Sequence, residues 1–225
     1  MDGFARSRAV VFDAYGTLFD VAAPTRALLG NRADEVGQLW RRKQLEYSWL
    51  RSLMGRHADF AQVTAQALDY ALKAHGIADG ALATKLREAY LTLPAYGDAA
   101  PALTALRRTG RRTAILSNGS PAMLDPMVKK SGLAPLLDMV LSIEDVGVFK
   151  PHPKVYGLAC DRLALPAEQI AFVSANGWDA AGAAAFGFTV AWLNRRGEPE
   201  ENLPARPAAT IASLAELPAL FATGA

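Results

Sequence analysis

The sequence predicts an α/β fold: a doubly wound parallel sheet with an all-helical part inserted after its first strand. Three observations predict it. Short apolar runs alternate with helix-like segments from residue 97 onward, which is typical of a parallel sheet covered on both faces. A similar apolar run stands near the start of the chain, at residues 9–12. Between that run and residue 97 the sequence is helix-like only.

The predicted strands are short apolar runs that carry β-branched residues. Strands buried on both faces show such continuous runs rather than an alternation of apolar and polar residues. The five predicted strands are 9–12, 113–116, 139–142, 170–173 and 189–193.

Helix-like segments separate the later strands. Gly110 and Gly132 stand just past two of them, where glycine commonly ends a helix. A Lys-Pro-His-Pro turn opens a third helix at residue 152. The predicted helices are 99–108, 121–130, 152–163 and 178–186, followed by a loop over 198–208 and a short helix near 214–221.

The inserted part consists of three predicted helices, 34–54, 59–75 and 80–92, before prolines break the pattern from residue 94. We therefore expect two domains. Residues 1–19 and 97–225 form the sheet-bearing core, and residues 20–96 form a helical cap.

Composition excludes several classes of protein. The 225 residues carry a net charge of only +2, so no strong field for nucleic acid or membrane is expected. Cys160 is the only cysteine, which rules out an intrachain disulfide. The three histidines, at 57, 75 and 152, lack metal-ligand spacing. Without a signal-like or membrane-spanning apolar segment, we expect a cytoplasmic protein.

Polar side chains stand where the predicted strands end or just beyond. Asp13 follows the first strand, Ser117 and Asn118 follow the second, and Ser174 and Asn176 follow the fourth. In open parallel sheets, ligands bind outside the carboxyl ends of the strands. The sequence therefore predicts a site at this edge, beneath the helical cap.

Four segments resemble the motifs of the haloacid dehalogenase (HAD) superfamily in their order along the chain. Residues 11–18 (VFDAYGTL), 115–119 (ILSNG), 150–151 (KP) and 173–179 (VSANGWD) carry the resemblance. Cap residues 39–41 and 43–51 are similar to the L-2-haloacid dehalogenase, or (S)-2-haloacid dehalogenase, branch. The resemblance implies a Rossmann-like core with an inserted cap, and a hydrolase acting on carbon–halide bonds.

Most members of the superfamily are magnesium-dependent phosphatases, and this chain departs from their pattern. Tyr15 stands where those enzymes carry a second aspartate, and Ala175 stands at an acidic position of the fourth motif. Magnesium favours octahedral oxygen ligation by carboxylates and phosphate, and a phosphoryl leaving group would lack its acid here. We therefore expect no metal and no cofactor.

The resemblance implies a catalytic set centred on Asp13, whose carboxylate is already ionised at neutral pH. Asp13 attacks carbon 2 of the haloacid, and Lys150 keeps it charged and oriented. Water then hydrolyses the ester, activated by Asp179 or by Lys150, and the sequence leaves that choice open. The remaining expected members are Asn176, which positions the water, and Thr17 or Ser174, which contact the ester oxyanion.

The implied binding set receives the halide and the substrate carboxylate. Arg41 is the expected halide acceptor, because its charge is permanent and weakly hydrated. The other expected members are Asn118 and Trp178 at the halide, Ser117 at the carboxylate, Leu45 and Phe60 in an apolar lid, Tyr156 in the Asp13–Lys150 network, and Tyr15. Arg42 is a departure, since this branch leads us to expect glutamine there. The aromatic helix between Trp40 and Trp49 predicts either a homodimer interface or cap core.

Two other functions remain open at this point. One is a magnesium-dependent phosphatase of small molecules in the same superfamily. The other is a binding protein that keeps the fold without catalysis. Taken singly, most of these residues have ordinary structural explanations, such as turns or helix caps. Their joint placement favours the enzyme.

Overall fold

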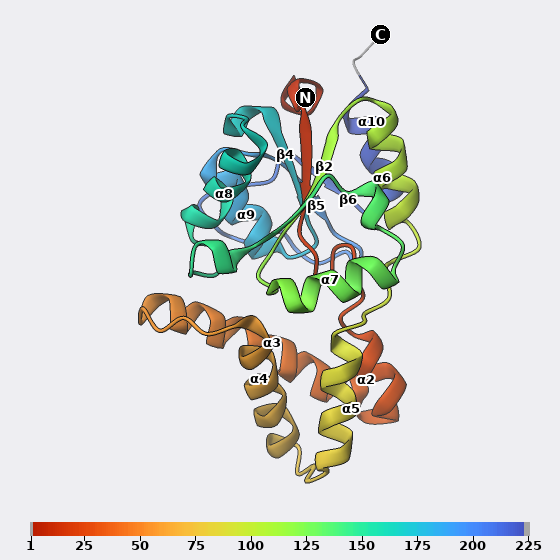
Figure 1. Ribbon diagram of the computed structural model, residues 1–225, viewed down its shortest axis with the longest axis vertical. Helices are drawn as coiled ribbons and strands as arrows, with labels where there is room; N and C mark the ends of the chain where they lie inside the picture. The colour runs from red at the N-terminus through yellow and green to blue at the C-terminus, as the bar shows by residue number, and fades with distance from the viewer. Residues whose placement is uncertain (1, 223–225) are drawn as a thin grey trace.

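The computed structural model describes residues 2–222 of the chain (Figure 1). Its centre is a six-stranded sheet in the order β3-β2-β1-β4-β5-β6, and every neighbouring pair is parallel. The strands are β1 (Ala9–Phe12), β2 (Arg112–Ser117), β3 (Met139–Ser142), β4 (Ile170–Ser174), β5 (Thr189–Leu193) and β6 (Ala209–Ile211).

Helices cover both faces of this sheet, as the alternation predicts. Helices α8 and α9 lie on one side, and α6 and α10 lie on the other (Figure 1). Their bounds are α6 (Ala99–Arg108), α7 (Pro121–Lys130), α8 (Pro153–Leu163), α9 (Gly177–Phe186) and α10 (Leu217–Leu220). The doubly wound α/β prediction is therefore confirmed.

All five predicted strands are present, within a residue of their expected ends. Besides several 3₁₀ turns of three residues, three of the described elements were not predicted: the short helices α1 (Asp2–Arg6) and α2 (Ala23–Leu28), and strand β6. Each has six residues or fewer. Runs this short contain too few repeats to show a period, and β6 is defined by its pairing with β5. The helix predicted over 214–221 is a 3₁₀ turn followed by the four-residue α10.

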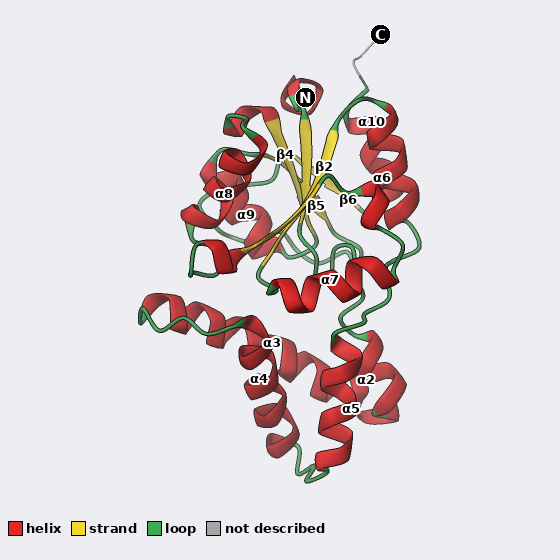
Figure 2. Ribbon diagram, viewed as in Figure 1, coloured by secondary structure: helices red, strands yellow, loops and turns green. Residues whose placement is uncertain are grey.

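The inserted part is helical throughout, as Figure 2 shows. After α2 it contains α3 (Ala33–Leu53), α4 (Phe60–Ala74) and α5 (Gly80–Tyr90). The two connections to the core run beside each other. The amide of Asp20 donates to the Pro94 carbonyl at 2.9 Å, and the amide of Tyr96 donates to the Leu18 carbonyl at 2.9 Å. This pairing supports our proposal that residues 20–96 form a cap.

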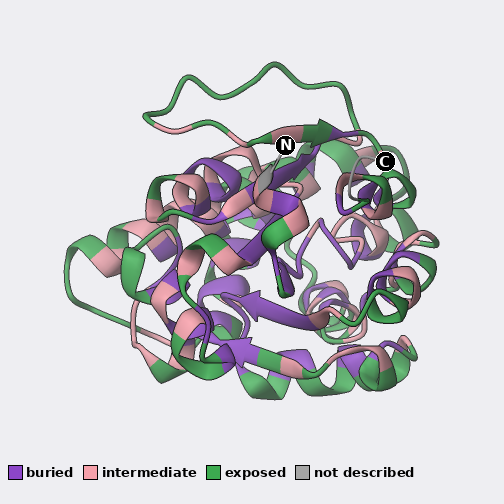
Figure 3. Cartoon of the chain, turned by 90° about the horizontal axis from the view of Figure 1, so that it is seen from above, coloured by how far each residue is buried: buried purple, intermediate pink, exposed green. Residues whose placement is uncertain are grey.

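Burial concentrates at the sheet and its helix contacts (Figure 3). All residues of β1 and β4 are buried. The core strands are thus held rigidly by apolar packing, which fixes the positions of the residues that follow them. No helix in the part of the chain that the structure describes is long and apolar enough to cross a membrane.

Candidate active site

The carboxyl ends of β2, β1 and β4 meet because these three strands are neighbours in the sheet. The register pairs Phe12 with Ile115 and with Val173, so the segments that follow start level with one another. Asp13 leaves β1 at this edge, and its amide donates to the Val173 carbonyl at 2.9 Å. The sheet therefore brings the predicted polar side chains together.

A buried lysine lies between two carboxylates. Lys150 Nζ is 3.0 Å from Asp13 Oδ1 and 3.0 Å from Asp179 Oδ2. Its side chain is only 1% exposed. Burial alone would lower the pKa of Lys150, but the two carboxylates more than offset this effect, and the pKa is raised. Lys150 therefore stays charged beside Asp13.

The second oxygen of Asp13 is held by two neutral donors. Asn176 Nδ2 lies 2.8 Å and Thr17 Oγ1 lies 3.1 Å from Asp13 Oδ2. Thr17 Oγ1 in turn accepts the Ala175 amide at 2.8 Å, so its proton is directed to Asp13. These contacts fix the orientation of the Asp13 carboxylate.

Asp179 is completely buried, and both of its oxygens have partners. Tyr156 donates its hydroxyl to Asp179 Oδ1 at 2.8 Å, and Lys150 occupies Oδ2. Burial raises the pKa of the Asp179 carboxyl, although Lys150 and Tyr156 oppose this rise. Burial, followed by the Asp179 charge, raises the pKa of Tyr156 well above its ordinary value, so the phenol remains a donor.

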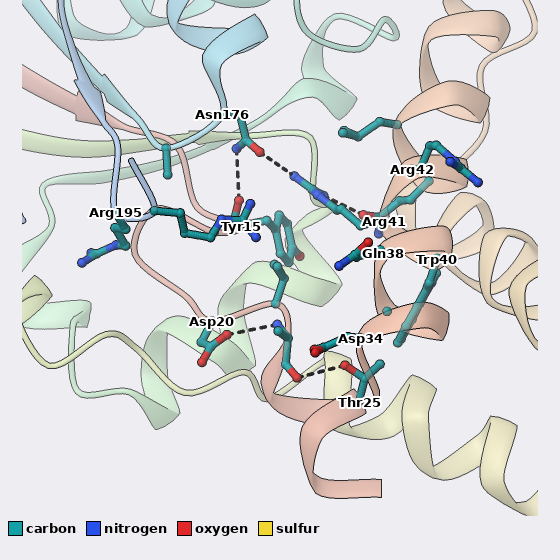
Figure 4. Close-up of a pocket in the computed structure, with 18 of the residues that line it drawn as sticks. Tyr15, Asp20, Thr25, Asp34, Gln38, Trp40, Arg41, Arg42, Asn176 and Arg195 are labelled. Atoms are coloured by element: carbon teal, nitrogen blue, oxygen red, sulfur yellow. Dashed lines mark hydrogen bonds between the residues drawn. The ribbon is translucent and has the colours of Figure 1, made fainter. Parts of the chain in front are cut away.

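Beside this cluster a cavity of about 570 Å³ opens between cap and core. Four predicted site residues line it: Tyr15, Arg41, Leu45 and Asn176. Figure 4 shows Arg41 reaching from its helix toward Asn176, and Arg41 Nη2 lies 3.3 Å from Asn176 Oδ1. Since Asn176 also contacts Asp13, it connects the cavity lining to that carboxylate. Arg42 lines the cavity too, but its guanidinium points away from Arg41 (Figure 4).

Three predicted residues hold the loops of the site in place. Ser117 Oγ accepts the Gly119 amide at 3.1 Å, and Ser174 Oγ accepts the Asn176 amide at 3.1 Å. Asn118 Oδ1 accepts the Lys150 amide at 3.0 Å. Side-chain to backbone contacts of this kind are typical of polar turns. They fix the loops in a form that places Lys150 and Asn176 near Asp13.

Two of the predicted aromatic residues, Phe60 and Trp178, lie at the contact between cap and core. The ring of Phe60 packs against Tyr15 and Phe149, with centroids 5.6 and 5.9 Å apart. Trp178 meets Trp49 of the cap edge-to-face at 5.3 Å. Neither lines the cavity, so in this arrangement both serve to join the two parts.

Sequence reasoning missed a polar group inside the cap. Gln44 is buried and accepts a hydrogen bond of 2.6 Å from Arg41 Nη1. Thr64 and Tyr90 surround the same amide. A signal was present: Val36, Trp40, Gln44 and Ser48 recur every four residues and are all buried. A glutamine on that stripe indicates a buried polar contact.

The donor set does not fit magnesium. Lys150 Nζ, a cation, contacts both Asp13 and Asp179, which are the two carboxylates of the site. Tyr15 and Ala175 offer no carboxylate oxygen at the positions where phosphatases carry one. Within residues 2–222, no group of three or more His, Cys, Asp or Glu side chains is arranged to hold a metal ion.

Comparison with known proteins gives consistent results. The family model for haloacid dehalogenase-like hydrolases matches residues 7–187. The chain is 46% identical to (S)-2-haloacid dehalogenase 1 of Pseudomonas sp. (strain CBS-3), over 95% of this chain and 96% of that protein. A solved dehalogenase structure, 44% identical, superposes with a TM-score of 0.94 and covers 97% of this chain and 98% of its own. An L-2-haloacid dehalogenase structure from Xanthobacter autotrophicus, with chloropropionic acid covalently bound, is 39% identical with a TM-score of 0.89, covering 95% and 98%.

Proposed function

Because the chain belongs to the haloacid dehalogenase-like hydrolase family, we propose that it hydrolyses short L-2-haloacids to D-2-hydroxy acids through an ester on Asp13. One observation carries this proposal. The Asp13 carboxylate is held between Lys150 and Asn176, and Asn176 also contacts the cationic Arg41 at the cavity. An anionic nucleophile and a separate cation are what displacement of a halide requires.

The first step forms a bond between an Asp13 oxygen and carbon 2 of the substrate. The electrons of the carbon–halogen bond leave with the halide, so this leaving group needs no proton. Attack opposite to the leaving group inverts the carbon centre. Arg41 receives the halide, since a guanidinium is a weakly hydrated cation that suits a large anion. Asn118 and Trp178 remain proposed halide neighbours, and Ser117 remains the proposed carboxylate contact.

In the second step, water attacks the carbonyl carbon of the Asp13 ester. The acyl–oxygen bond breaks, the hydroxy acid leaves with inverted configuration, and one proton is released. We assign proton acceptance to Asp179, because burial raises its pKa and makes it a stronger base than an ordinary aspartate. Asn176 positions the water, and Lys150 links Asp179 to Asp13. Thr17 and the nearby amides stabilise the oxyanion.

The deciding experiment is halide release from L-2-chloropropionate in buffer that contains EDTA, with product chirality as a second measurement. We expect chloride and D-lactate from the wild-type protein. Asp13→Asn should lower turnover by at least about 10⁴-fold, because the amide is neutral and a poor nucleophile. Asp125→Asn, which changes a helix carboxylate outside the site, is the matched control and should remain active.

Single-turnover hydrolysis in ¹⁸O-water separates the ester mechanism from direct attack by water. Label in the Asp13 carboxylate supports the ester, whereas label found only in lactate refutes it. Turnover that appears only when magnesium is added, on a phosphoester, would support the phosphatase. Full activity of Asp13→Asn would reject Asp13 as nucleophile, and no turnover by the wild type would favour a binding protein. A homodimer and a cytoplasmic location remain predictions.

A further inference from the structure

The amide of Gln44 forms a buried contact with Arg41 inside the cap. Gln44 is 1% exposed, and its Oε1 accepts from Arg41 Nη1 at 2.6 Å. Its Nε2 donates to Thr64 Oγ1 at 2.6 Å, and the Tyr90 hydroxyl lies 3.2 Å from the same nitrogen. Every polar atom of this buried amide therefore has a partner, which is the condition for burying it without loss of stability.

The direction of this network follows from the chemistry of Arg41. A guanidinium only donates hydrogen bonds, so the side that faces Arg41 must be the amide oxygen. The amide nitrogen is then directed to Thr64 and Tyr90, both of which can accept. Arg41 thus dictates one orientation of Gln44, and Thr64 on α4 holds that orientation in place.

The consequence concerns where the arginine charge is directed. Gln44 ties Nη1 to the cap, while Nη2 reaches across the cavity to Asn176 at 3.3 Å. Because the amide is neutral, it anchors the guanidinium without cancelling its charge. A carboxylate at the same place would hold Arg41 equally well but would pair with it and weaken its attraction for another anion.

We propose that Gln44, braced by Thr64, is a positioning residue that aims Arg41 at the departing halide while leaving its full charge available. This inference rests on the proposed dehalogenation. It predicts a selective defect. Stabilisation of the leaving group matters more for chloride, the poorer leaving group, than for bromide, so losing the anchor should widen the rate difference between the two substrates.

The test compares inhibition by bromide and the ratio of kcat for L-2-bromopropionate to kcat for L-2-chloropropionate. For Gln44→Leu we expect bromide inhibition to weaken about tenfold and the kcat ratio to rise about fivefold, as for loss of a charged hydrogen bond. Gln44→Glu should keep Arg41 in place and still weaken bromide inhibition about tenfold, because the charge is cancelled. Thr64→Val removes only the hydrogen bond from Gln44 Nε2 to Thr64. Bromide inhibition and the kcat ratio should then each change about threefold, in the same directions as for Gln44→Leu.

Val63→Ala is the matched control, since Val63 is equally buried on α4 but makes no polar contact. It should lower thermal stability and leave bromide inhibition and the kcat ratio unchanged. Should Gln44→Leu fail to fold, Thr64→Val and Gln44→Glu carry the test. Unchanged bromide inhibition and an unchanged ratio in the folded variants would overturn the role of Gln44. Absence of halide release by the wild type would instead overturn the proposed function.

Discussion

Lys150 is the residue on which the charge balance of the site depends. Its ammonium lies 3.0 Å from both Asp13 and Asp179, and removing it would leave two buried carboxylates without the cation that they share. Burial and the Asp13 charge both raise the pKa of Asp179, and the charge of Lys150 opposes this rise. The lysine therefore balances the charges of two carboxylates, and one of them, Asp13, is the proposed nucleophile.

This arrangement predicts a pH profile. The pKa of Lys150 is raised above its ordinary value of 10.5. A raised lysine pKa contributes stability that is fully present below the unfolded-state value and is lost as pH rises through the folded-state value. We expect kcat/KM and the free energy of unfolding to stay level from neutral pH to about 10 and to fall only above the ordinary lysine range.

Urea denaturation and steady-state kinetics across pH 7–11.5 measure both quantities. Arginine stays charged over this pH range. The free energy of unfolding of Lys150→Arg should therefore fall less at alkaline pH than that of the wild type, because deprotonation of Lys150 no longer contributes. A fall in wild-type kcat/KM centred near pH 8, at constant stability, would contradict a raised lysine pKa.

At the residue scale, the sequence identified the groups that follow strands and missed those inside the cap. Asp13 and Asn176 were predictable because parallel strands bring their ends to one edge. The burial of Gln44 was missed, because glutamine in a long helix is usually solvent-exposed. Its place on a stripe that recurs every four residues was the available signal, and the packing of α3 on α4 and α5 shows that this stripe faces inward.

At the scale of elements, helix α9 owes its small residues to a close approach. A Cβ on Gly182 would lie 2.7 Å from Pro151 Cβ and 2.7 Å from the Tyr156 hydroxyl oxygen. The helix therefore packs directly on the two segments that carry Lys150 and the Asp179 hydrogen bond. The sequence showed a helix rich in small residues, but it gave no sign of which element that helix would contact.

Gly182→Ala should therefore destabilise the protein by about 1–3 kcal/mol through overpacking. Gly157→Ala is a matched variant on α8, where the nearest atom to a new Cβ is 3.9 Å away. It should stabilise by about 0.5–1 kcal/mol, because alanine is the better helix former. Urea denaturation measures both, and the prediction is wrong if the two variants shift the midpoint in the same direction.

At the scale of the whole molecule, the site is complete only when the cap meets the core. Arg41 bonds Asn176 across the cavity, and Ser52 Oγ of the cap accepts the Phe149 amide of the core at 3.0 Å. His57 and Glu144 form a third contact at 2.9 Å. The sequence predicted a helical insertion, but these contacts join residues 87 to 135 positions apart. No local pattern encodes such pairs.

The aromatic helix α3 left two explanations open, and the structure favours cap core for Trp40, whereas Trp49 lies at the contact between cap and core. Trp40 donates to the Thr64 carbonyl at 2.9 Å, and Trp49 packs on Trp178. The exposed apolar side chains lie instead at the end of the helix, where Leu53 is 84% and Met54 is 62% exposed. Figure 1 shows this end projecting beyond the core. If two chains associate through α3, they should meet there.

We therefore expect the wild-type protein to be a homodimer and the double variant Leu53→Asp, Met54→Asp to be a monomer, because paired like charges at the centre of an interface cost several kcal/mol. Light scattering after size-exclusion chromatography measures the mass, and circular dichroism checks that the fold is kept. Leu203→Asp changes an exposed leucine on the loop between β5 and β6 and should leave the dimer intact. A wild-type monomer, or a double variant that stays dimeric, would show that α3 does not join two chains.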